Sequence, residues 1–408
     1  MLCTKQKVSH ISFLLLLVIL LAILPGCWSK KELNELAIVM AMGIDYDDSD
    51  YEVSIQVMKS SEVGKSEGGS SDGAPVITYR TSGKTIPEAL QRMLSVAPRV
   101  PYLSHIRVLI FGESLARSGV SDALDFLSRN QQLRTDFFML VSKGGKASEI
   151  LDVVTSFENI PANSLYSSIL LSEKKWAVTG RVTLQQFITQ MERRGSNPVL
   201  PGVQVVGNKK EGESHENKKR VVPMTLLKHV GLAVFNRDRL VGWLGEPLSK
   251  STNYALNEVN TTSGYIEGPE GGIVGFEVRR TESDIKVKLG EDNVPEFTVK
   301  MTMETDLNSV QSTVDLQKSD TVEWINRKIE QKVDSYVTRD LRIIQEKYGT
   351  DVFGFGEALH RKYPKLWKKL RDHWDEQFKQ CKITVKSKVA IRRIGSIVQP
   401  VKREMNEQ

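Results

Sequence analysis

The sequence predicts a multi-domain protein of the α+β and α/β classes, in which mixed and antiparallel sheets are covered by helices. Strand and helix patterns interleave up to about residue 206, and alternating strand patterns dominate from about residue 224. One long amphipathic pattern at about 320–348 predicts a helix that covers the second region. With 408 residues, 40% of them hydrophobic, the chain can form two or three domains with their own cores.

The N-terminus predicts a lipoprotein signal peptide. Lys5 and Lys7 precede an apolar run of about 14 residues, 11–24, which is too short to cross ~30 Å of hydrocarbon as a helix. The run ends in Leu-Pro-Gly-Cys, and a small residue directly before a cysteine is typical of lipoprotein processing sites, although Pro25 is unusual there. We expect residues 1–26 to be removed and lipid, such as palmitate, to be attached to Cys27. An ordinary secretory signal followed by a chance cysteine is the alternative.

The cysteine count excludes an intramolecular disulfide in the processed chain. Cys3 leaves with the signal peptide and Cys27 carries lipid, so only Cys381 remains, and we expect it to be a buried packing residue. No later apolar run approaches the ~18 residues of a membrane-spanning helix. The prediction is therefore a folded body held by lipid on the outer face of the cell membrane.

The region 27–206 is expected to be α/β, with a possible division near residue 145. Residues 37–44 form a continuous apolar run typical of a buried strand, and 51–57 alternate like its half-buried antiparallel partner. Thr85 and Glu88 predict a capping box for a helix through Leu94. Further strands are expected at 106–111 and 137–141, and helices near 120–127 and 184–191. The polar, glycine-rich segment 59–75 is interpreted as a long loop within this region.

The polar segment 207–223 is interpreted as a linker to a C-terminal α+β domain at 224–408. We expect strands at 230–235, 240–244, 273–279, 285–289 and 297–304, the first two forming a hairpin across 236–238. Asp320 with Glu323 predicts the capping box of the long helix, and Gly349 its end. Alternation at 383–391 predicts one more strand in the same sheet.

Basic residues are concentrated in the last segment of the chain. Residues 360–408 hold fourteen Lys or Arg against five Asp or Glu, a net charge of +9. For a protein anchored at an anionic bilayer, this indicates either a surface that faces the membrane or an acidic partner, or charges spread over a solvated surface.

The sequence offers no catalytic, cofactor-binding or metal-binding residues. It has no HExxH, paired CxxC, P-loop or GxSxG motif, and its five histidines after the signal peptide, at 105, 215, 229, 360 and 373, lack helical metal-ligand spacing. The loop 264–272 is not followed by a helix that could bind phosphate. Trp367 and Trp374 are expected to be core aromatics, with a place at the membrane interface as the alternative. We therefore expect a protein that is not an enzyme and binds no nucleic acid.

Several motifs, in order along most of the processed chain, resemble the Ger(x)C family of spore germination lipoproteins. Cys27 opens the first motif, Cys-Trp-Ser-Lys-Lys-Glu-Leu-Asn-Glu-Leu-Ala-Ile-Val, which runs on to Gly-Ile-Asp at 43–45. Later matching positions are Ser104-His105, 111–113, 115–116, Gly119, 124–127, Arg129, 231–235, 240–242, Leu244, 351–356, Tyr363-Pro364, Trp367, Trp374, Phe378, Ile391 and Gly395. Departures from the family pattern are Pro25, Ser29 where an acidic residue is common, and the insert at 64–75.

The resemblance implies a non-enzymatic subunit of a three-part nutrient germinant receptor in the inner membrane of the spore, needed for nutrient-triggered germination after sporulation. Its implied partners are a transporter-like membrane subunit, a second membrane subunit with a large soluble domain, and the bilayer that holds the lipid on Cys27. The family fold is usually described as three domains. A solute-binding or scaffold lipoprotein of another membrane complex is the alternative, although the strand-rich second region argues against two similar binding lobes.

Overall fold

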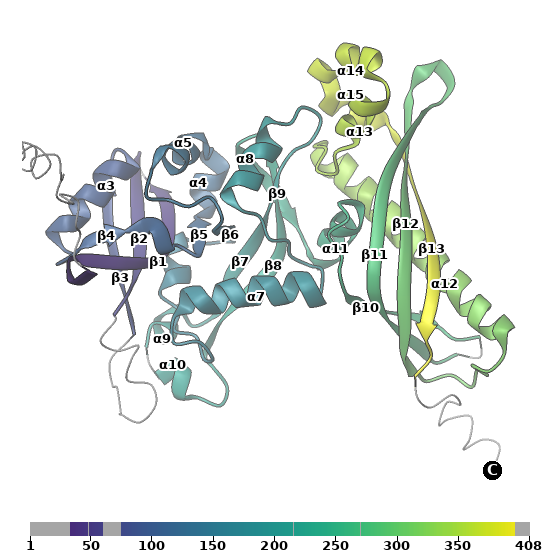
Figure 1. Cartoon of the computed structure of the whole chain (residues 1–408), viewed down its shortest axis with the longest axis horizontal. Helices are drawn as coiled ribbons and strands as arrows, with labels where there is room; N and C mark the ends of the chain where they lie inside the picture. Colours follow the sequence, from purple (N-terminus) through teal and green to yellow (C-terminus); the bar gives the residue numbers. More distant parts are fainter. Residues whose placement is uncertain (1–32, 48, 60–74, 215, 270, 396–408) are drawn as a thin grey trace, which may run out of the picture.

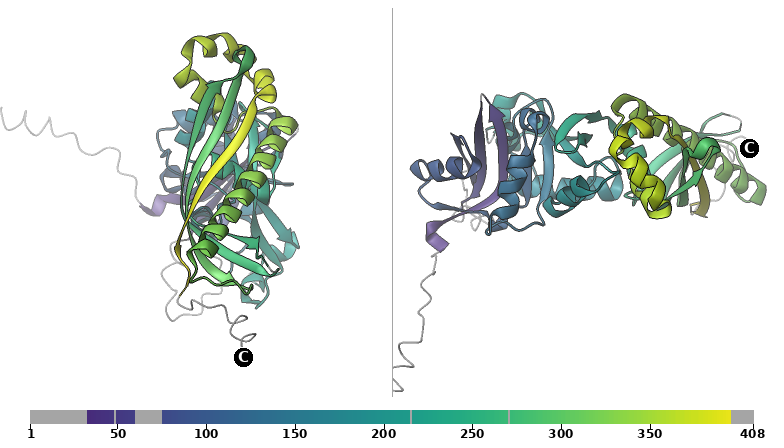
Figure 2. Two further views of the ribbon diagram at one scale, coloured as in Figure 1. Left: turned by 90° about the vertical axis from the view of Figure 1, so that its right-hand side faces the viewer. Right: turned by 90° about the horizontal axis from the view of Figure 1, so that it is seen from above.

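The computed structural model describes residues 33–47, 49–59, 75–214, 216–269 and 271–395. Two sheets lie at opposite ends of an elongated molecule, with helix α11 (Glu246–Ala255) between them (Figure 1). The view from above in the right panel of Figure 2 shows the same separation. The α+β and α/β prediction is confirmed.

The first sheet has nine strands, in the order β3-β2-β1-β5-β6-β7-β8-β9, with β4 paired to β1. The pairs β1–β4, β1–β5, β5–β6 and β6–β7 are parallel, and β2–β3, β1–β2, β7–β8 and β8–β9 are antiparallel. Its strands are β1 (Leu36–Asp47), β2 (Asp50–Met58), β3 (Val76–Gly83), β4 (Val100–Tyr102), β5 (Val108–Phe111), β6 (Phe138–Ser142), β7 (Val199–Gly207), β8 (Thr225–Asn236) and β9 (Arg239–Leu244).

Both faces of this sheet are covered, which explains its continuous apolar runs. In β5, Leu109 and Phe111 belong to one buried cluster while Val108 and Ile110 belong to another, because side chains alternate between the faces of a strand. The covering helices are α3 (Ile86–Arg92), α4 (Glu113–Ser118), α5 (Ser121–Arg129), α6 (Ala147–Leu151), α7 (Pro161–Lys175) and α8 (Leu184–Glu192). The expected cap at Thr85 is present, since its side chain accepts a hydrogen bond from the Glu88 N–H.

The linker expected at 207–223 requires a correction. The segment holds two short helices, α9 (Lys209–Gly212) and α10 (Glu216–Lys219), and connects β7 to β8, which pair with each other in one sheet. The predicted hairpin across 236–238 is present, but it extends the first sheet and not the second. The sheet also continues from β6 to β7 across the possible division near residue 145. The polarity of 207–223 correctly indicated a loop. Because the strands on either side of it pair with each other, the loop lies within the first sheet's domain and does not separate two domains.

The second sheet has the order β10-β11-β12-β13, and β12 and β13 are parallel. Its strands are β10 (Thr262–Glu267), β11 (Ile273–Leu289), β12 (Pro295–Val310) and β13 (Lys382–Arg393). The long helix α12 (Ser319–Tyr348) packs its apolar stripe on one face of the sheet and ends at Gly349, which is left-handed at φ 60°. Its expected capping box is absent: the helix begins one residue before Asp320, and Lys318 provides no side-chain cap.

Helix α12 also protects the edge of the second sheet. Asn326, Glu330 and Asp334 lie four residues apart on the helix and accept hydrogen bonds from the backbone N–H groups of Ile391, Val389 and Ser387 at 3.2, 2.8 and 2.7 Å. These side chains satisfy donors that an edge strand would otherwise offer to another chain. The edge of β13 is therefore blocked against strand addition at these positions.

Short helices complete the chain between α12 and β13. They are α13 (Phe355–Lys362), α14 (Pro364–Leu370), η5 (Arg371–His373) and α15 (Trp374–Gln380). One buried apolar cluster includes Leu232, Val234 and Leu244 of the first sheet together with residues of α11, α12 and the second sheet. The two sheets therefore share a core.

Candidate functional site

A crevice opens where β1, β5 and β6 end, which is where open α/β sheets bind their ligands. It has a volume of about 490 Å³ and is lined by Asp45, Tyr46, Asp47, Glu113, Ser114, Gly144, Gly145, Lys146 and Glu149. The parallel pairing of these strands brings residues about 100 positions apart to one edge of the sheet.

The side chain of Asp45 fills the base of this crevice. Its carboxylate oxygens accept hydrogen bonds from the N–H groups of Ala147 and Ser148, at the start of α6, at 2.7 and 3.1 Å. A Cβ atom at Gly112 would lie 1.9 Å from Asp45 Oδ1, so position 112 needs glycine because the carboxylate occupies that space. The backbone donors that could hold an anion here are already used by the chain itself.

The other charges of the crevice are paired in the same way. Glu113 accepts hydrogen bonds from the Gly144 N–H at 2.6 Å and from the Trp243 indole at 3.1 Å. Lys146 lies 3.0 Å from Asp47, and Lys209 lies 2.6 Å from Glu149. The charged side chains that line the crevice are thus paired with other groups of the chain, which favours a structural role for them.

The pH dependence of stability should report the burial of Asp45. Burial raises its pKa from 3.8 to about 6, while hydrogen bonds from Ala147 and Ser148 act in the opposite direction. Because the folded-state pKa is the higher one, the folded chain binds more protons between about pH 4 and pH 6. Stability therefore falls as pH rises through that range. In the unmutated protein this loss of stability amounts to up to about 2–3 kcal/mol, and we expect Asp45→Asn to abolish it. Urea unfolding of both proteins at pH 4.5 and pH 7 measures the loss of stability between these pH values. An equal loss in the two proteins would contradict the prediction.

The second candidate site is built around Asp351, at the contact between the half of the molecule that holds the first sheet, up to β9, and the half that holds the second sheet, from α11 onward. We call this contact the joint. This carboxylate is fully buried and accepts hydrogen bonds from the N–H groups of Phe353, Gly354, Phe355 and Gly356 at 2.8–3.2 Å. The Trp374 indole donates a fifth at 3.0 Å. Burial raises the pKa of Asp351 to about 6, and these hydrogen bonds oppose the shift. One carboxylate thus organises the turn before α13 and anchors α15.

The same turn is locked to the first half of the chain. The backbone oxygen of Asp351 accepts a hydrogen bond from the Asn197 N–H at 2.6 Å, and the Gly195 oxygen accepts one from the Glu357 N–H at 3.3 Å. A Cβ atom at Gly195 would lie 2.5 Å from Trp367 Cη2 and 2.8 Å from the carbonyl carbon of Gly356. Two glycine backbones therefore meet in van der Waals contact, under the ring of Trp367.

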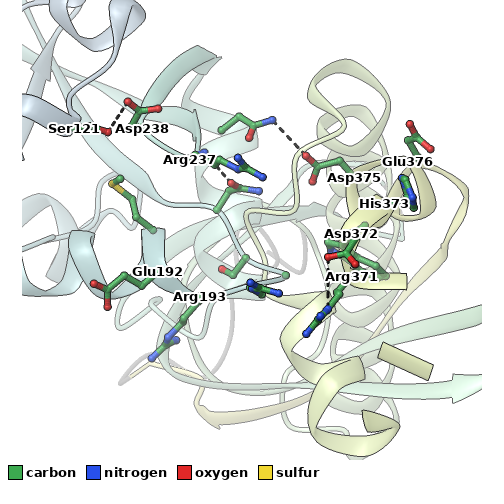
Figure 3. A pocket seen from close by; sticks show the side chains of 17 residues that line it. Ser121, Glu192, Arg193, Arg237, Asp238, Arg371, Asp372, His373, Asp375 and Glu376 are labelled. Atoms are coloured by element: carbon green, nitrogen blue, oxygen red, sulfur yellow. Dashed lines mark hydrogen bonds and ion pairs between the residues drawn. The ribbon is translucent and has the colours of Figure 1, made fainter. Parts of the chain in front are cut away.

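A polar cavity of about 680 Å³ borders this joint (Figure 3). Arg193 and Arg237 come from the first half, and Arg371, Asp372 and Asp375 from the second. Asn236 donates to Asp375 at 3.4 Å, and Ser121 donates to Asp238 at 2.7 Å. The walls carry both signs of charge, so the cavity has no clear preference for an anion or a cation.

The sequence prediction of core aromatics at Trp367 and Trp374 is confirmed. The side chains are 3% and 4% exposed, and their rings pack edge to face with centroids 5.4 Å apart. The alternative at a membrane interface is wrong, because both rings are inside the joint. Sequence reasoning had assigned no role to Asp351 or Gly195. The signal for Asp351 was present in the repeated glycines and aromatics that follow it.

The histidines and the cysteine form no reactive centre in the described ranges. His229 is half-buried, with Nε2 2.8 Å from Ser168 Oγ, and its loss of solvent lowers its pKa to about 4. His215 lies outside the described residues, as do the signal peptide and Cys27. Burial raises the pKa of the Cys381 thiol to about 12, consistent with a packing residue. Among the described residues there is no group of acidic, His and Cys side chains that could hold a metal ion.

The helices within the described ranges include none that is long and apolar enough to cross a bilayer. The basic residues of 360–395 are distributed over several elements. Lys365, Lys368 and Lys369 belong to α14, while Lys386 and Lys388 lie on β13, beyond the intervening α15. Residues 396–408, with two more basic residues, lie outside the described part of the chain.

Comparison with known proteins matches an N-terminal and a C-terminal part of the chain to described families. Residues 29–205 match the family described as "Spore germination protein N-terminal domain", and residues 230–395 match "Spore germination B3/ GerAC like, C-terminal". The gap between the two matches, 206–229, contains the whole 207–223 segment. The division between these families therefore falls near the boundary expected from the sequence, even though the sheet crosses it.

Relatives in Bacillus subtilis (strain 168) are similar over nearly their whole length. "Spore germination protein KC" is 29% identical over 96% of this chain and 98% of the relative. "Spore germination protein B3" is 24% identical over 92% and 94%, and "Spore germination protein A3" is 23% identical over 92% and 95%. The solved structure "Crystal Structure of the GerBC protein" aligns with a TM-score of 0.52 at 17% identity. It covers 86% of this chain and 96% of that one, so the fold is shared.

Proposed function

Because this chain belongs to the Ger(x)C family of spore germination proteins, we propose that it is a non-enzymatic subunit of a nutrient germinant receptor, held by lipid on Cys27 at the outer face of the spore inner membrane. A role in spore germination follows from the family. The receptor, the lipid and the membrane are the proposal.

The observation that carries the non-enzymatic assignment is the pairing of charges in the crevice of the first sheet. The Asp45 carboxylate accepts the hydrogen bonds of the backbone N–H groups at the base of the crevice, and the charges around it pair with one another. We therefore propose that another subunit recognises the nutrient. This chain would provide surfaces to which the other subunits bind.

A scaffold role agrees with the way in which the two halves are joined. The backbone contacts of Gly195 and Asp351, together with the shared apolar cluster, hold the two sheets in one arrangement. A rigid, elongated body can bind partners at well-separated points. We propose that these partners are a transporter-like membrane subunit and a second membrane subunit with a large soluble domain.

The test is affinity capture of the tagged full-length protein from detergent-solubilised spore membranes, followed by mass spectrometry. We expect a polytopic transporter-like protein and a second membrane protein to be enriched over an untagged control. Capture of an ATP-driven permease instead would support the alternative of a solute-binding lipoprotein, and capture of neither membrane subunit would contradict the receptor assignment.

Cys27→Ala tests the anchor separately. The variant lacks the only attachment point for lipid in the processed chain, so we expect it to leave the membrane fraction while keeping the circular dichroism spectrum of a folded protein. Carbonate extraction of membranes from cells that make each protein gives the measurement, with Cys381→Ala as the matched control that keeps the anchor. Retention of both variants in the membrane would rule out anchoring by Cys27.

A further inference from the structure

Exposed apolar side chains lie in the short segment between α3 and β4 and at the first residue of β4. Leu94, Val96 and Val100 are 52%, 55% and 45% exposed, within seven residues of chain. Large apolar side chains that stay in water over such a short stretch indicate a contact surface. We refer to the exposed residues of 92–100 as the α3–β4 surface.

The α3–β4 surface has a basic character. Arg92 and Arg99 are exposed within it, and residues 89–112 contain three arginines and no aspartate or glutamate. Arg92 is partly neutralised by Glu88, with 2.6 Å between the charged atoms. Apolar side chains flanked by arginine are what an anionic bilayer surface attracts, because the apolar groups enter the interface and the cations face the phosphates.

This surface adjoins the point at which the N-terminal segment enters the fold. Leu36 at the start of β1 pairs with Val100 of β4, in parallel. Cys27 precedes Leu36 by nine residues, which span at most about 30 Å. In Figure 1, α3 and β4 lie at one end of the long axis and the second sheet lies at the other. A lipid on Cys27 would thus keep the α3–β4 surface near the membrane, with no such constraint on the far end.

We infer that the α3–β4 surface rests on the anionic bilayer and that the molecule stands on this end, with the β10–β13 sheet projecting away from the membrane. The inference depends on the lipid anchor of the proposed function and adds an orientation to it. It also means that the basic C-terminal region faces away from the bilayer, toward space in which soluble parts of partner subunits can reach it.

Two other surfaces compete for the membrane. Phe157, Val221 and Val222 are strongly exposed beside α9 and α10. The segment that connects Cys27 to the fold does not enter the fold at that region. The basic residues of β13 are partly neutralised, since Lys382 lies opposite Glu296 and Arg392 lies 2.6 Å from Glu304. Neither surface is tied to Leu36, where the N-terminal segment enters the fold, as the α3–β4 surface is through Val100.

Site-specific fluorescence distinguishes the three surfaces. The lipidated full chain is prepared with one cysteine at a time, as Val96→Cys, Val222→Cys or Lys388→Cys, each labelled with the environment-sensitive dye NBD. Cys381 is 5% exposed and its thiol is hard to ionise, so it does not compete for the dye. The proteins are bound to vesicles of phosphatidylcholine and phosphatidylglycerol that contain a doxyl-labelled lipid as quencher.

We expect the dye at position 96 to shift its emission to the blue and to lose most of it to the quencher, while the dyes at 222 and 388 stay bright. Quenching at 222 or 388 equal to that at 96, or a bright dye at 96 on a protein that floats with the vesicles, would overturn the orientation and leave the anchor standing. Failure of every labelled protein to float would remove the anchor, and with it the basis of the inference.

Discussion

Asp351→Ala is expected to lower the free energy of unfolding by about 3–5 kcal/mol, among the largest effects of a single substitution. The change leaves four buried backbone N–H groups and the Trp374 indole without their acceptor. Asp351 is fully buried, so bulk solvent does not reach these donors in the folded protein. Urea unfolding followed by tryptophan fluorescence measures the loss, and Trp374 should report it directly.

Asp372→Ala is the matched control for this experiment. Its side chain is 69% exposed and its only described ion pair, with Arg371, is 3.6 Å long. An exposed pair of this kind contributes between about 0 and 1 kcal/mol. Equal stabilities of the two variants would show that the Asp351 carboxylate does not organise the joint.

Gly195→Ala should destabilise the protein by about 2–4 kcal/mol, through two separate effects. Gly195 has φ +85°, where a side chain costs about 1–2 kcal/mol, and its added Cβ would meet Trp367 at 2.5 Å and the Gly356 backbone at 2.8 Å. The carbonyl carbon of Gly356 cannot move without shifting α13. The two halves of the molecule should therefore separate slightly, and limited proteolysis should become faster near 193–198.

Gly354→Ala separates the two effects. Its φ is +82°, almost that of Gly195, yet the nearest atom to an added Cβ is 3.9 Å away. We expect only the backbone cost, about 1–2 kcal/mol. If Gly195→Ala is no worse than Gly354→Ala, the glycine contact is not what holds the two halves together.

Both predictions concern the joint, where several positions that carry the family resemblance meet without any chemistry of their own. Asp351 and the glycine-aromatic run after it, Trp367 and Trp374 meet at one joint. Gly112 and Glu113 lie at the crevice of the first sheet. The positions at the joint keep the two sheets in one arrangement, and those at the crevice fix the ends of strands in the first sheet.

Local patterns were enough to predict many elements of this protein. The buried strand β1, the cap at Thr85, the hairpin after 235 and the stripe of α12 all follow from periodicity and turn chemistry within short windows. The lipid site at Cys27 was also predicted from a short motif, and it remains a prediction outside the described residues. Family membership followed from the order of short motifs along the chain.

The placement of the secondary-structure elements relative to one another became clear only from the tertiary structure. The polar segment 207–223 looked like a linker, yet β7 and β8 on either side of it pair in one sheet, because strand pairing depends on backbone groups that sequence polarity does not report. The roles of Asp45, Gly195 and Asp351 likewise depend on partners supplied by distant parts of the chain. In these cases burial and close backbone approach are set by packing between elements, which a window of neighbouring residues does not contain.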